Sequence, residues 1–387
     1  MNELTLEDLL LAIDKKPKLI SSKMHFIVYG AGSFGKMIGE LIEKAGFRIQ
    51  CFLDRIENKN FPWDVRTLQN IKLVDDNAIV VLGIHNGYFD LRQITMELQS
   101  QGFENIISSV ELVHSLDRMM NEGYFDSYNP RESNWLPHYW LDSRPHYLSY
   151  HVEIIDGLDL FKDNLSKFIY LSTWCYRLTG DMQYLFDPSP VDDQYFDASV
   201  QRLGRQGKDS LRFIDCGAFT GDTYRMARRN NYDIAAYAGF EPDLNNFRRL
   251  CAEVAKAPIH DAVLFPCAAY SNVTSLSFVA NHGAASNINY VGDMAVPGVP
   301  IDFCLRNFRP NFIKMDVEGG ELEVIEGAIE TILDSRPDLA IAVYHKPQDI
   351  FKLARHLSQM SVGYQFFLRS YYHQGMDTVM YAFSDNR

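Results

Sequence analysis

An apolar segment that ends in an acidic residue and a glycine-rich turn constrains this chain more than any other feature. Residues 213–223 read Phe-Ile-Asp-Cys-Gly-Ala-Phe-Thr-Gly-Asp-Thr, so Asp215 closes a predicted strand, and Gly217 and Gly221 lie in the turn that follows. Glycine lets a backbone approach a ligand closely, and the amide groups that begin a helix attract negatively charged groups. The segment therefore predicts a strand, a tight turn and a helix that bind a nucleotide-like ligand.

Two later apolar segments also end in acidic residues. Residues 236–240 lead into Glu241 and Pro242, and the strand predicted at residues 312–316 ends in Asp316. In an open parallel sheet, ligands bind beyond the carboxyl ends of the strands. We therefore expect Asp215, Glu241 and Asp316 to meet at one edge of a sheet. Glu241 is the expected ribose partner, because a carboxylate can accept hydrogen bonds from both hydroxyl groups of a diol.

The last part of the chain, residues 208–387, alternates predicted strands with predicted helices, which indicates an α/β fold with a mainly parallel sheet. No helix separates the final two strands, so an antiparallel strand is expected at the sheet edge. Seven strands with acids in these positions favour a class I S-adenosylmethionine (SAM) methyltransferase fold over a dinucleotide-binding fold. The strands are predicted at residues 211–215, 236–240, 263–265, 312–316, 339–344, 364–367 and 379–383, and the helices near 224–230, 244–255, 321–334 and 348–358.

A second glycine-rich turn lies near the start of the chain. Gly30, Gly32 and Gly35 follow a predicted strand at residues 25–29 and open a helix, and Asp54 ends the next strand. This arrangement is typical of a dinucleotide-binding turn. Two interpretations stay open: a scaffold that no longer binds a ligand, or a site in which these four residues bind NAD, another nucleotide or a nucleotide-sugar. No residue nearby is suited to hydride chemistry, so a dehydrogenase is not favoured.

Three regions follow from these patterns. We predict a short Rossmann-like domain at residues 1–112, a mainly helical connector rich in aromatic residues at 113–207, and the methyltransferase-like domain at 208–387. The connector is expected to pack against the last domain and to cover its cleft.

Composition narrows the class of partner. The formal net charge is −13 at pH 7 and no cluster of lysine and arginine stands out, so we expect no nucleic-acid partner. The six cysteines are scattered without a Cys-x-x-Cys pair, which argues against a zinc site or a disulfide framework. No apolar run reaches the roughly 18 residues of a membrane span, and the first residues lack the layout of a signal peptide. The sequence therefore predicts a cytoplasmic protein, and a homo-oligomer is compatible with it.

Residues 208–387 resemble the FkbM-type methyltransferases, which modify hydroxyl groups of sugars and polyketides. The most specific matching segment is 312–319, Phe-Ile-Lys-Met-Asp-Val-Glu-Gly, and further matches are 213–222, 239–243, 267–269 and 299–302. Gly320 departs from the alanine that many relatives carry. The resemblance implies a SAM-dependent enzyme of this fold. Together with the strand ends, it predicts the cofactor-binding residues Asp215, Gly217, Ala218, Gly221, Glu241, Pro242 and Ala268.

Four residues are candidates for catalysis. A hydroxyl acceptor must lose a proton, which a carboxylate or histidine can take, or which a bound divalent cation can weaken. We predict Asp316 and Glu318 as a base or a metal-binding pair, His345 as a second base, and Lys314 on the same side of its strand as Asp316. Simpler roles stay open: helix N-terminal acids for Glu318 and Glu321, an ion-pair partner for Lys314, and a structural histidine for His345. His282, in the loop at residues 281–286, is a further candidate for contact with the acceptor.

Three functions are compatible with these observations. The leading hypothesis is a SAM-dependent O-methyltransferase that acts on a hydroxyl of a sugar, nucleotide-sugar or glycan precursor. The second is a nucleotide-binding or regulatory protein that keeps a silent methyltransferase domain. The third is a bifunctional enzyme whose first domain holds the nucleotide half of the acceptor. Three desolvated carboxylates at one cleft have no purpose in a silent domain, which favours the enzyme.

Overall fold

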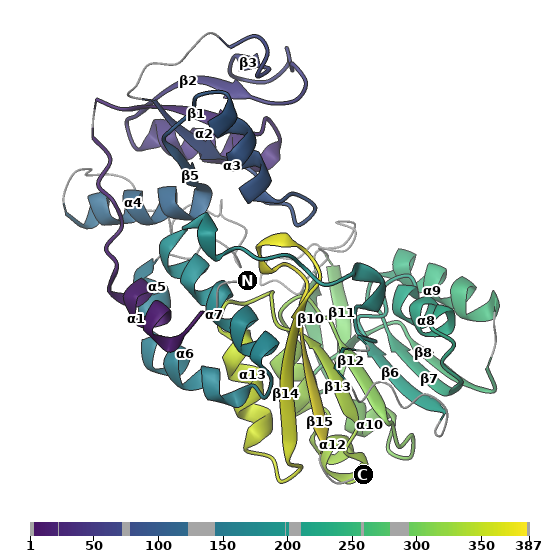
Figure 1. The fold of residues 1–387 in the computed structure, drawn as a ribbon. Coiled ribbons are helices and arrows are strands. Elements are labelled where there is room, and N and C mark those ends of the chain that lie inside the picture. Colours follow the sequence, from purple (N-terminus) through teal and green to yellow (C-terminus); the bar gives the residue numbers. More distant parts are fainter. Residues whose placement is uncertain are drawn as a thin grey trace. The chain divides into compact units, whose positions relative to one another are not determined.

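The computed structural model of the chain describes residues 4–21, 23–71, 78–122, 144–197, 199–200, 210–256, 259–278 and 294–384. The chain forms two compact units (Figure 1). The first comprises Met1–Leu158, Lys167–Pro188 and Tyr372–Met376, and the second comprises Asp159–Ser166, Ser189–Tyr371 and Asp377–Arg387. Residues 113–207, predicted as a separate connector, are therefore divided between the two units. Loop 281–286, which contains His282, lies outside the described residues.

The first unit is built on a parallel sheet with strand order β3-β2-β1-β4-β5. Strands β1 and β4 are almost wholly buried, as parallel strands covered on both faces must be. Because β2 and β4 flank β1, the strand order reverses between β1 and β4, and ligands bind at such points. The strands are β1 His25–Tyr29, β2 Arg48–Leu53, β3 Val65–Arg66, β4 Ala78–Leu82 and β5 Ile106–Ser108.

Helices follow the strands of this sheet and continue into the region predicted as helical. The helix after the first glycine turn is α2 Ser33–Lys44, and α3 Leu91–Ser100 follows β4. The remaining helices are α1 Leu6–Asp14, α4 Ser109–Asn121, α5 Arg144–Leu148, α6 His151–Gly157 and α7 Asn164–Thr179.

The second unit contains the predicted seven-stranded sheet, with order β14-β15-β13-β12-β6-β7-β8. Strand β15 runs antiparallel to both of its neighbours, and the other pairs are parallel. The predicted α/β class and the class I methyltransferase sheet are thus confirmed. The strands are β6 Leu211–Cys216, β7 Ile234–Phe240, β8 Asp261–Phe265, β12 Phe312–Met315, β13 Asp338–Ala342, β14 Tyr364–Ser370 and β15 Thr378–Ser384.

The predicted helices of this unit lie between the strands, with two differences: the short helix α10 was not predicted, and one predicted helix is divided. The single helix predicted at residues 321–334 is two helices, α11 Glu321–Glu326 and α12 Ile329–Ser335. The break falls at Gly327, where an added Cβ atom would lie 2.0 Å from the carbonyl oxygen of Tyr270. The close approach of another segment therefore fixes the break. The other helices are α8 Asp222–Arg229, α9 Leu244–Lys256, α10 Ile301–Cys304 and α13 Asp349–Ser358.

A small second sheet was not predicted. It has the order β10-β11-β9, with β9 Ala268–Ala269, β10 Thr274–Phe278 and β11 Met294–Val299. Strand β9 has only two residues and β11 contains Pro297, so neither has the long apolar pattern that identifies a strand in sequence. Among the described residues, no helix combines the length and apolarity that a membrane span requires.

Gly32 and Gly35, the last two glycines of the first turn, differ in how much space the fold leaves for a side chain. A Cβ atom at position 35 would lie 1.8 Å from the carbonyl oxygen of Gly30, whereas one at position 32 would meet nothing within 4 Å. Gly35→Ala is therefore expected to destabilise the first unit by at least about 1–3 kcal/mol through overpacking. Gly32→Ser is the matched control and should change stability by less than about 0.5 kcal/mol, because serine is a favoured helix N-cap. Urea unfolding measures both, and equal stability would contradict this account.

Candidate active site

The turn after β6 is held against β12 by its backbone. Gly217 adopts a φ of +76°, and an added Cβ atom would lie 1.9 Å from the carbonyl oxygen of Asp316. The amides of Gly217 and Ala218 both donate to the carbonyl of Phe240, over 3.0 and 2.9 Å. Gly221, at a φ of +78°, is the N-cap of α8. Only glycine fits the first position, so the fold itself fixes this turn at the carboxyl ends of the central strands.

Glu241 follows β7 directly and lies against the same turn. Its Oε2 accepts from the amide of Phe219 over 2.8 Å, and its Oε1 accepts from the amide of Asp243 over 2.8 Å. Burial raises the pKa of Glu241 to about 7, although the two backbone donors lower it. Each carboxylate oxygen retains a second lone pair, so a ribose diol can still be bound here. Glu241, predicted as the ribose partner, therefore lies against the turn and can accept further hydrogen bonds.

A buried ion pair links Asp215 to Lys314. The Lys314 ammonium lies 3.3 Å from Oδ1 of Asp215 and donates to the carbonyl of Gly217 over 2.6 Å. Tyr237 donates to the other oxygen of Asp215 over 2.9 Å. Burial raises the pKa of Asp215 to about 6, and Lys314 opposes the rise. Lys314 therefore contacts the turn and Asp215. These contacts correspond to the ion-pair role that the sequence offers as the alternative to catalysis by Lys314.

The predicted cofactor-binding residues lie in or after three neighbouring strands. Asp215 is in β6, Pro242 follows Glu241 after β7, and Ala268 lies in β9 of the small second sheet, a few residues after β8. Strands β6, β7 and β8 are neighbours in the seven-stranded sheet. Their carboxyl ends are where a parallel sheet binds a ligand.

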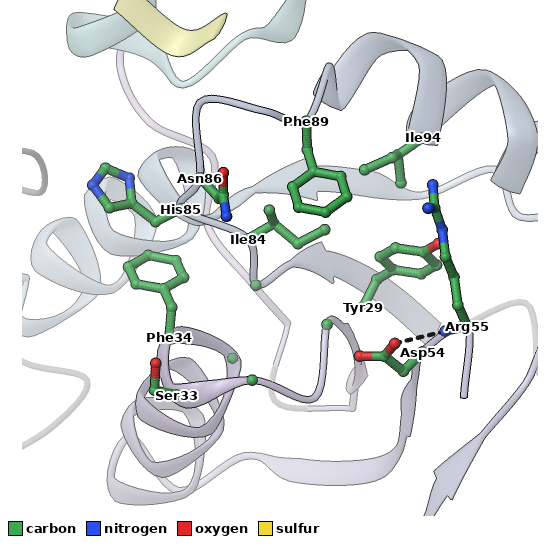
Figure 2. Close-up of a pocket in the computed structure, with 14 residues that line it drawn as sticks. Tyr29, Ser33, Phe34, Asp54, Arg55, Ile84, His85, Asn86, Phe89 and Ile94 are labelled. Atoms are coloured by element: carbon green, nitrogen blue, oxygen red, sulfur yellow. Dashed lines mark hydrogen bonds between the residues drawn. The ribbon is translucent and has the colours of Figure 1, made fainter. Parts of the chain in front are cut away.

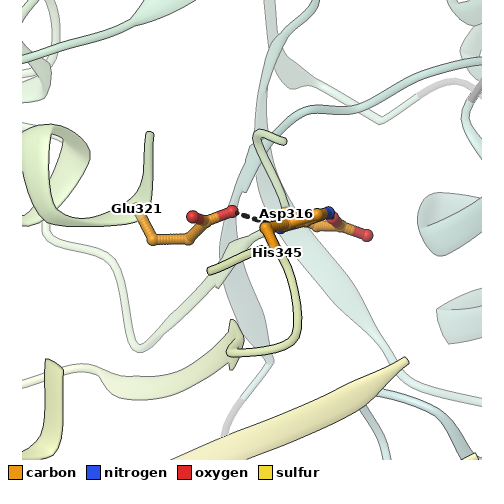
Figure 3. Close-up of side chains that lie close together, drawn as sticks. All are labelled: Asp316, Glu321 and His345. Atoms are coloured by element: carbon orange, nitrogen blue, oxygen red, sulfur yellow. Dashed lines mark hydrogen bonds and ion pairs between the residues drawn. The ribbon is translucent and has the colours of Figure 1, made fainter. Parts of the chain in front are cut away.

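Beside this edge, a histidine lies among carboxylates (Figure 3). His345 follows β13, and its Nδ1 lies 2.9 Å from Oε1 of Glu321. Its Nε2 lies 3.4 Å from Oδ1 of Asp316 and 3.5 Å from Oε2 of Glu318. An ionised carboxylate only accepts, so Nδ1 donates to Glu321. The structure thus brings Asp316, Glu318 and His345 together as predicted, and it adds Glu321.

Glu321 also shapes the loop that carries Glu318. Its Oε1 accepts from the amides of Val317, over 3.0 Å, and Gly319, over 3.3 Å. Glu318 has a φ of +58°, a left-handed conformation that costs a non-glycine residue about 1–2 kcal/mol. Glu321 therefore stabilises a strained loop and orients His345 at once. The sequence predicts Glu321 as an acid at a helix N-terminus, and this residue also carries part of the resemblance to the FkbM-type methyltransferases.

Tyr195 is a second residue whose role the sequence did not reveal. Its hydroxyl donates to Oδ2 of Asp316 over 2.6 Å, and its amide donates to the hydroxyl of Tyr381 over 3.1 Å. Tyr195 lies 121 positions before Asp316, in the stretch predicted as connector. No local pattern marks it, because only the tertiary fold brings the two side chains together. Tyr195 and His345 thus contact opposite oxygens of one carboxylate.

The charges in this cluster are coupled. Burial disfavours the imidazolium, but Glu321, Asp316 and Glu318 outweigh it and raise the pKa of His345 to about 10. Burial raises the pKa of Glu318 to about 8. Burial also acts on Asp316, yet Lys314 and His345 hold the pKa of its carboxyl below the ordinary value. At neutral pH the cluster therefore holds a charged His345, an ionised Asp316 and a Glu318 close to its titration point.

The same cluster offers the ligand set for a divalent cation. Asp316, Glu321 and His345 each present one ligand atom, all within 4.8 Å of one another. Oδ1 of Asp316 and Oε2 of Glu321 are buried and accept no hydrogen bond from the described residues. Mixed carboxylate and imidazole ligands suit divalent transition metals. The set shares Asp316 with the predicted pair, but it contains Glu321 and His345 and lacks Glu318. A cation would compete with the proton on His345.

The predicted residues of the first unit also lie together. Gly30, Gly32, Gly35 and Asp54 line a cavity of about 280 Å³ (Figure 2). This cavity belongs to the first unit alone. The turn after β6, at residues 217–221 and called the SAM turn below, belongs to the second unit.

Comparisons with known proteins agree with the fold and with the methyltransferase class. Residues 215–377 match the family model described as the methyltransferase FkbM domain. The crystal structure of methyltransferase FkbM from Methylobacillus flagellatus KT has a TM-score of 0.75 at 18% identity and covers 99% of this chain and 100% of that chain. At that identity the likeness shows the fold alone. No curated protein matches the chain in sequence.

Two other solved structures resemble part of the chain. An rRNA methylase from Streptococcus thermophilus is 12% identical and covers 46% of this chain and 88% of its own, with a TM-score of 0.29. Fibrillarin from Aeropyrum pernix, with natively bound SAM, is 14% identical and covers 45% of this chain and 67% of its own, with a TM-score of 0.26. The matched family model and the geometry of the site decide the class: residues 215–377 form an FkbM-type domain, and the chain is a SAM-dependent methyltransferase.

Proposed function

We propose that this enzyme methylates a hydroxyl group of a sugar, a nucleotide-sugar or a glycan precursor. The observation that carries the proposal is the cluster of Asp316, Glu318 and His345 at the carboxyl ends of β12 and β13, beside the SAM turn. Methyl transfer to a hydroxyl needs a nearby proton acceptor, and this cluster supplies carboxylates for that purpose.

Each part of the proposed site has a separate task. When bound, SAM would supply a methyl group from its positively charged sulfonium sulfur. The turn at Gly217 and the carboxylate of Glu241 hold it, and the chain's remaining contribution is positioning and proton transfer. We assign the proton transfer to Glu318, whose side chain is 24% exposed. Burial raises its pKa to about 8, and a base works best when its pKa lies near the working pH.

His345 and Tyr195 would act on Asp316 and Glu318 as positioning residues. The hydroxyl of Tyr195 and Nε2 of His345 face the two oxygens of Asp316, so the carboxylate has one orientation. The imidazolium also lies 3.5 Å from Glu318 and favours its ionised form. A polyhydroxylated acceptor suits such a site, because an apolar one would leave these buried polar groups unsatisfied. FkbM-type relatives that modify sugar hydroxyls support the same acceptor class.

Labelled SAM should transfer its methyl group to at least one member of a panel of free sugars, nucleotide-sugars and glycan precursors. With that acceptor, Glu318→Gln is expected to lower kcat by about 10²–10⁴-fold, the usual contribution of a general base. SAM affinity, measured by calorimetry, should stay unchanged, and Glu318→Asp should recover part of the rate. Full activity in Glu318→Gln would remove the base assignment, and labelling of no panel member would contradict the acceptor class.

The titration of His345 tests the coupling within the cluster. By NMR, its imidazole should stay protonated up to a pKa of about 10. In Glu321→Gln, the pKa of His345 should fall toward or below the ordinary value of 6.5. Burial lowers this pKa, and fewer negative charges then oppose that effect. A raised pKa means that the ion pair contributes its full stability below pH 6.5 and loses it as pH rises through about 10. An equal pKa of His345 in the original protein and in Glu321→Gln would show that Glu321 does not raise this pKa.

Removal of metal separates the two routes by which a hydroxyl can be activated. If Glu318 takes the proton, turnover should fall less than about twofold after treatment with a chelator, since no step of that route needs a cation. A loss of activity that added Mn²⁺ or Mg²⁺ restores would contradict this route. It would assign Asp316, Glu321 and His345 as the ligands that lower the pKa of the acceptor hydroxyl.

A further inference from the structure

We propose that the first unit binds a ribonucleoside phosphate in the cavity between the ends of β1 and β4. This function goes beyond methyl transfer, and it depends on residues of the first unit alone. The cavity, of about 280 Å³, lies where the strand order of the sheet reverses (Figure 2). Open parallel sheets bind ligands at the point where their strand order reverses.

The backbone of the first turn repeats that of the SAM turn. In the first unit, the amide of Gly30 donates to the carbonyl of Leu53, the last residue of β2, over 2.7 Å. In the second unit, the amide of Gly217 donates to the carbonyl of Phe240, the last residue of β7, over 3.0 Å. Both turns therefore begin at the same place relative to the neighbouring strand.

The carboxylate that follows is held in the same way in both units. Oδ2 of Asp54 accepts from the amide of Ala31, in the first turn, over 2.7 Å. Oε2 of Glu241 accepts from the amide of Phe219, in the SAM turn, over 2.8 Å. In each case the acid directly follows the strand, and a backbone amide of the turn fixes one oxygen. Asp54 can therefore accept from ribose hydroxyls, as Glu241 is placed to do for SAM.

The glycines separate what the fold needs from what a ligand needs. Gly30 has a φ of +110°, and Gly35 has no room for a Cβ atom, so the fold requires both. Gly32 has an ordinary φ of −94°, and a Cβ atom there would meet nothing within 4 Å. It is also the N-cap of α2, without a side-chain cap and without an acid in the first helical turn. The open space and the uncapped amides suit a phosphate group.

Part of the remaining wall of the cavity is apolar and suits a nucleotide base. Ile84, Phe89 and Ile94 line it on the side of β4 and α3 (Figure 2). The guanidinium of Arg55 lies 5.7 Å from the ring centroid of Phe89 and adds a positive charge beside Asp54. Aromatic and aliphatic walls with a few polar groups are typical of small-molecule sites. The volume suits one nucleotide, and this single sheet lacks the second half that a complete dinucleotide site uses.

Calorimetry on the full chain tests the proposal. The probes are ADP, GDP, UDP, CDP and NAD, each titrated with S-adenosylhomocysteine at saturation so that the SAM site is filled. At least one nucleoside diphosphate should bind with a stoichiometry of one. Its 2′,3′-dideoxy form should bind about tenfold or more weakly, because Asp54 loses its partners. An absence of heat from every probe, or equal affinity for the dideoxy form, would overturn the proposal.

Two variants of one position provide the matched comparison. Gly32→Asp and Gly32→Asn add side chains of almost equal size, and both residues are favoured N-caps, so each should keep the thermal stability of the first unit. The Asp variant should weaken nucleotide binding by more than about tenfold relative to Asn, because both side chains cap the helix but only the Asp charge repels phosphate. Equal thermal unfolding of the two variants shows that the first unit is folded in both. Equal nucleotide affinity in the two variants would show that no phosphate lies at this turn. Because these assays measure binding only, their failure leaves the methyl-transfer proposal intact.

Discussion

The approach of Gly217 to the carbonyl of Asp316 is the constraint on which the second unit depends. No side chain fits between these backbones, so the SAM turn and the acidic end of β12 form one rigid edge. The buried ammonium of Lys314 strengthens this edge by contacting both Asp215 and the carbonyl of Gly217. Backbone geometry therefore fixes the turn relative to the end of β12. Such rigidity is what an in-line displacement needs.

The second constraint is the concentration of negative charge beside that edge. Asp316, Glu318 and Glu321 all lie within reach of one histidine. Burial alone would favour the neutral forms of Asp316 and Glu318. The imidazolium of His345 offsets part of this cost, which is why its pKa rises. Asp316 remains ionised, whereas the pKa of Glu318 rises to about 8. The pKa values of Asp316 and Glu318 thus shift in opposite directions because the surroundings of the two carboxyl groups differ.

The sequence predicted the central sheet well because parallel strands are continuous apolar runs that end in recognisable acids. All seven strands of the second unit, and the edge where Asp215, Glu241 and Asp316 lie, follow from that pattern. The sequence could not reveal Tyr195, whose contact with Asp316 spans 121 positions. It also could not show that Glu321 orients His345, since an acid at a helix start has a simpler local explanation. Short strands such as β9 carry too few residues for any periodicity.

The two glycine turns show how one backbone arrangement can serve different purposes. After β4, the amide of Gly83 donates to the carbonyl of Tyr29 over 2.9 Å, and after β12, the amide of Asp316 donates to the carbonyl of Cys216 over 3.1 Å. These positions correspond, yet one carries no side chain and the other carries a carboxylate. At this position the first unit therefore has room for a ligand, whereas the second unit has a carboxylate. The two units share the arrangement of the sheet and the turn, and they differ in the side chains that follow these strands.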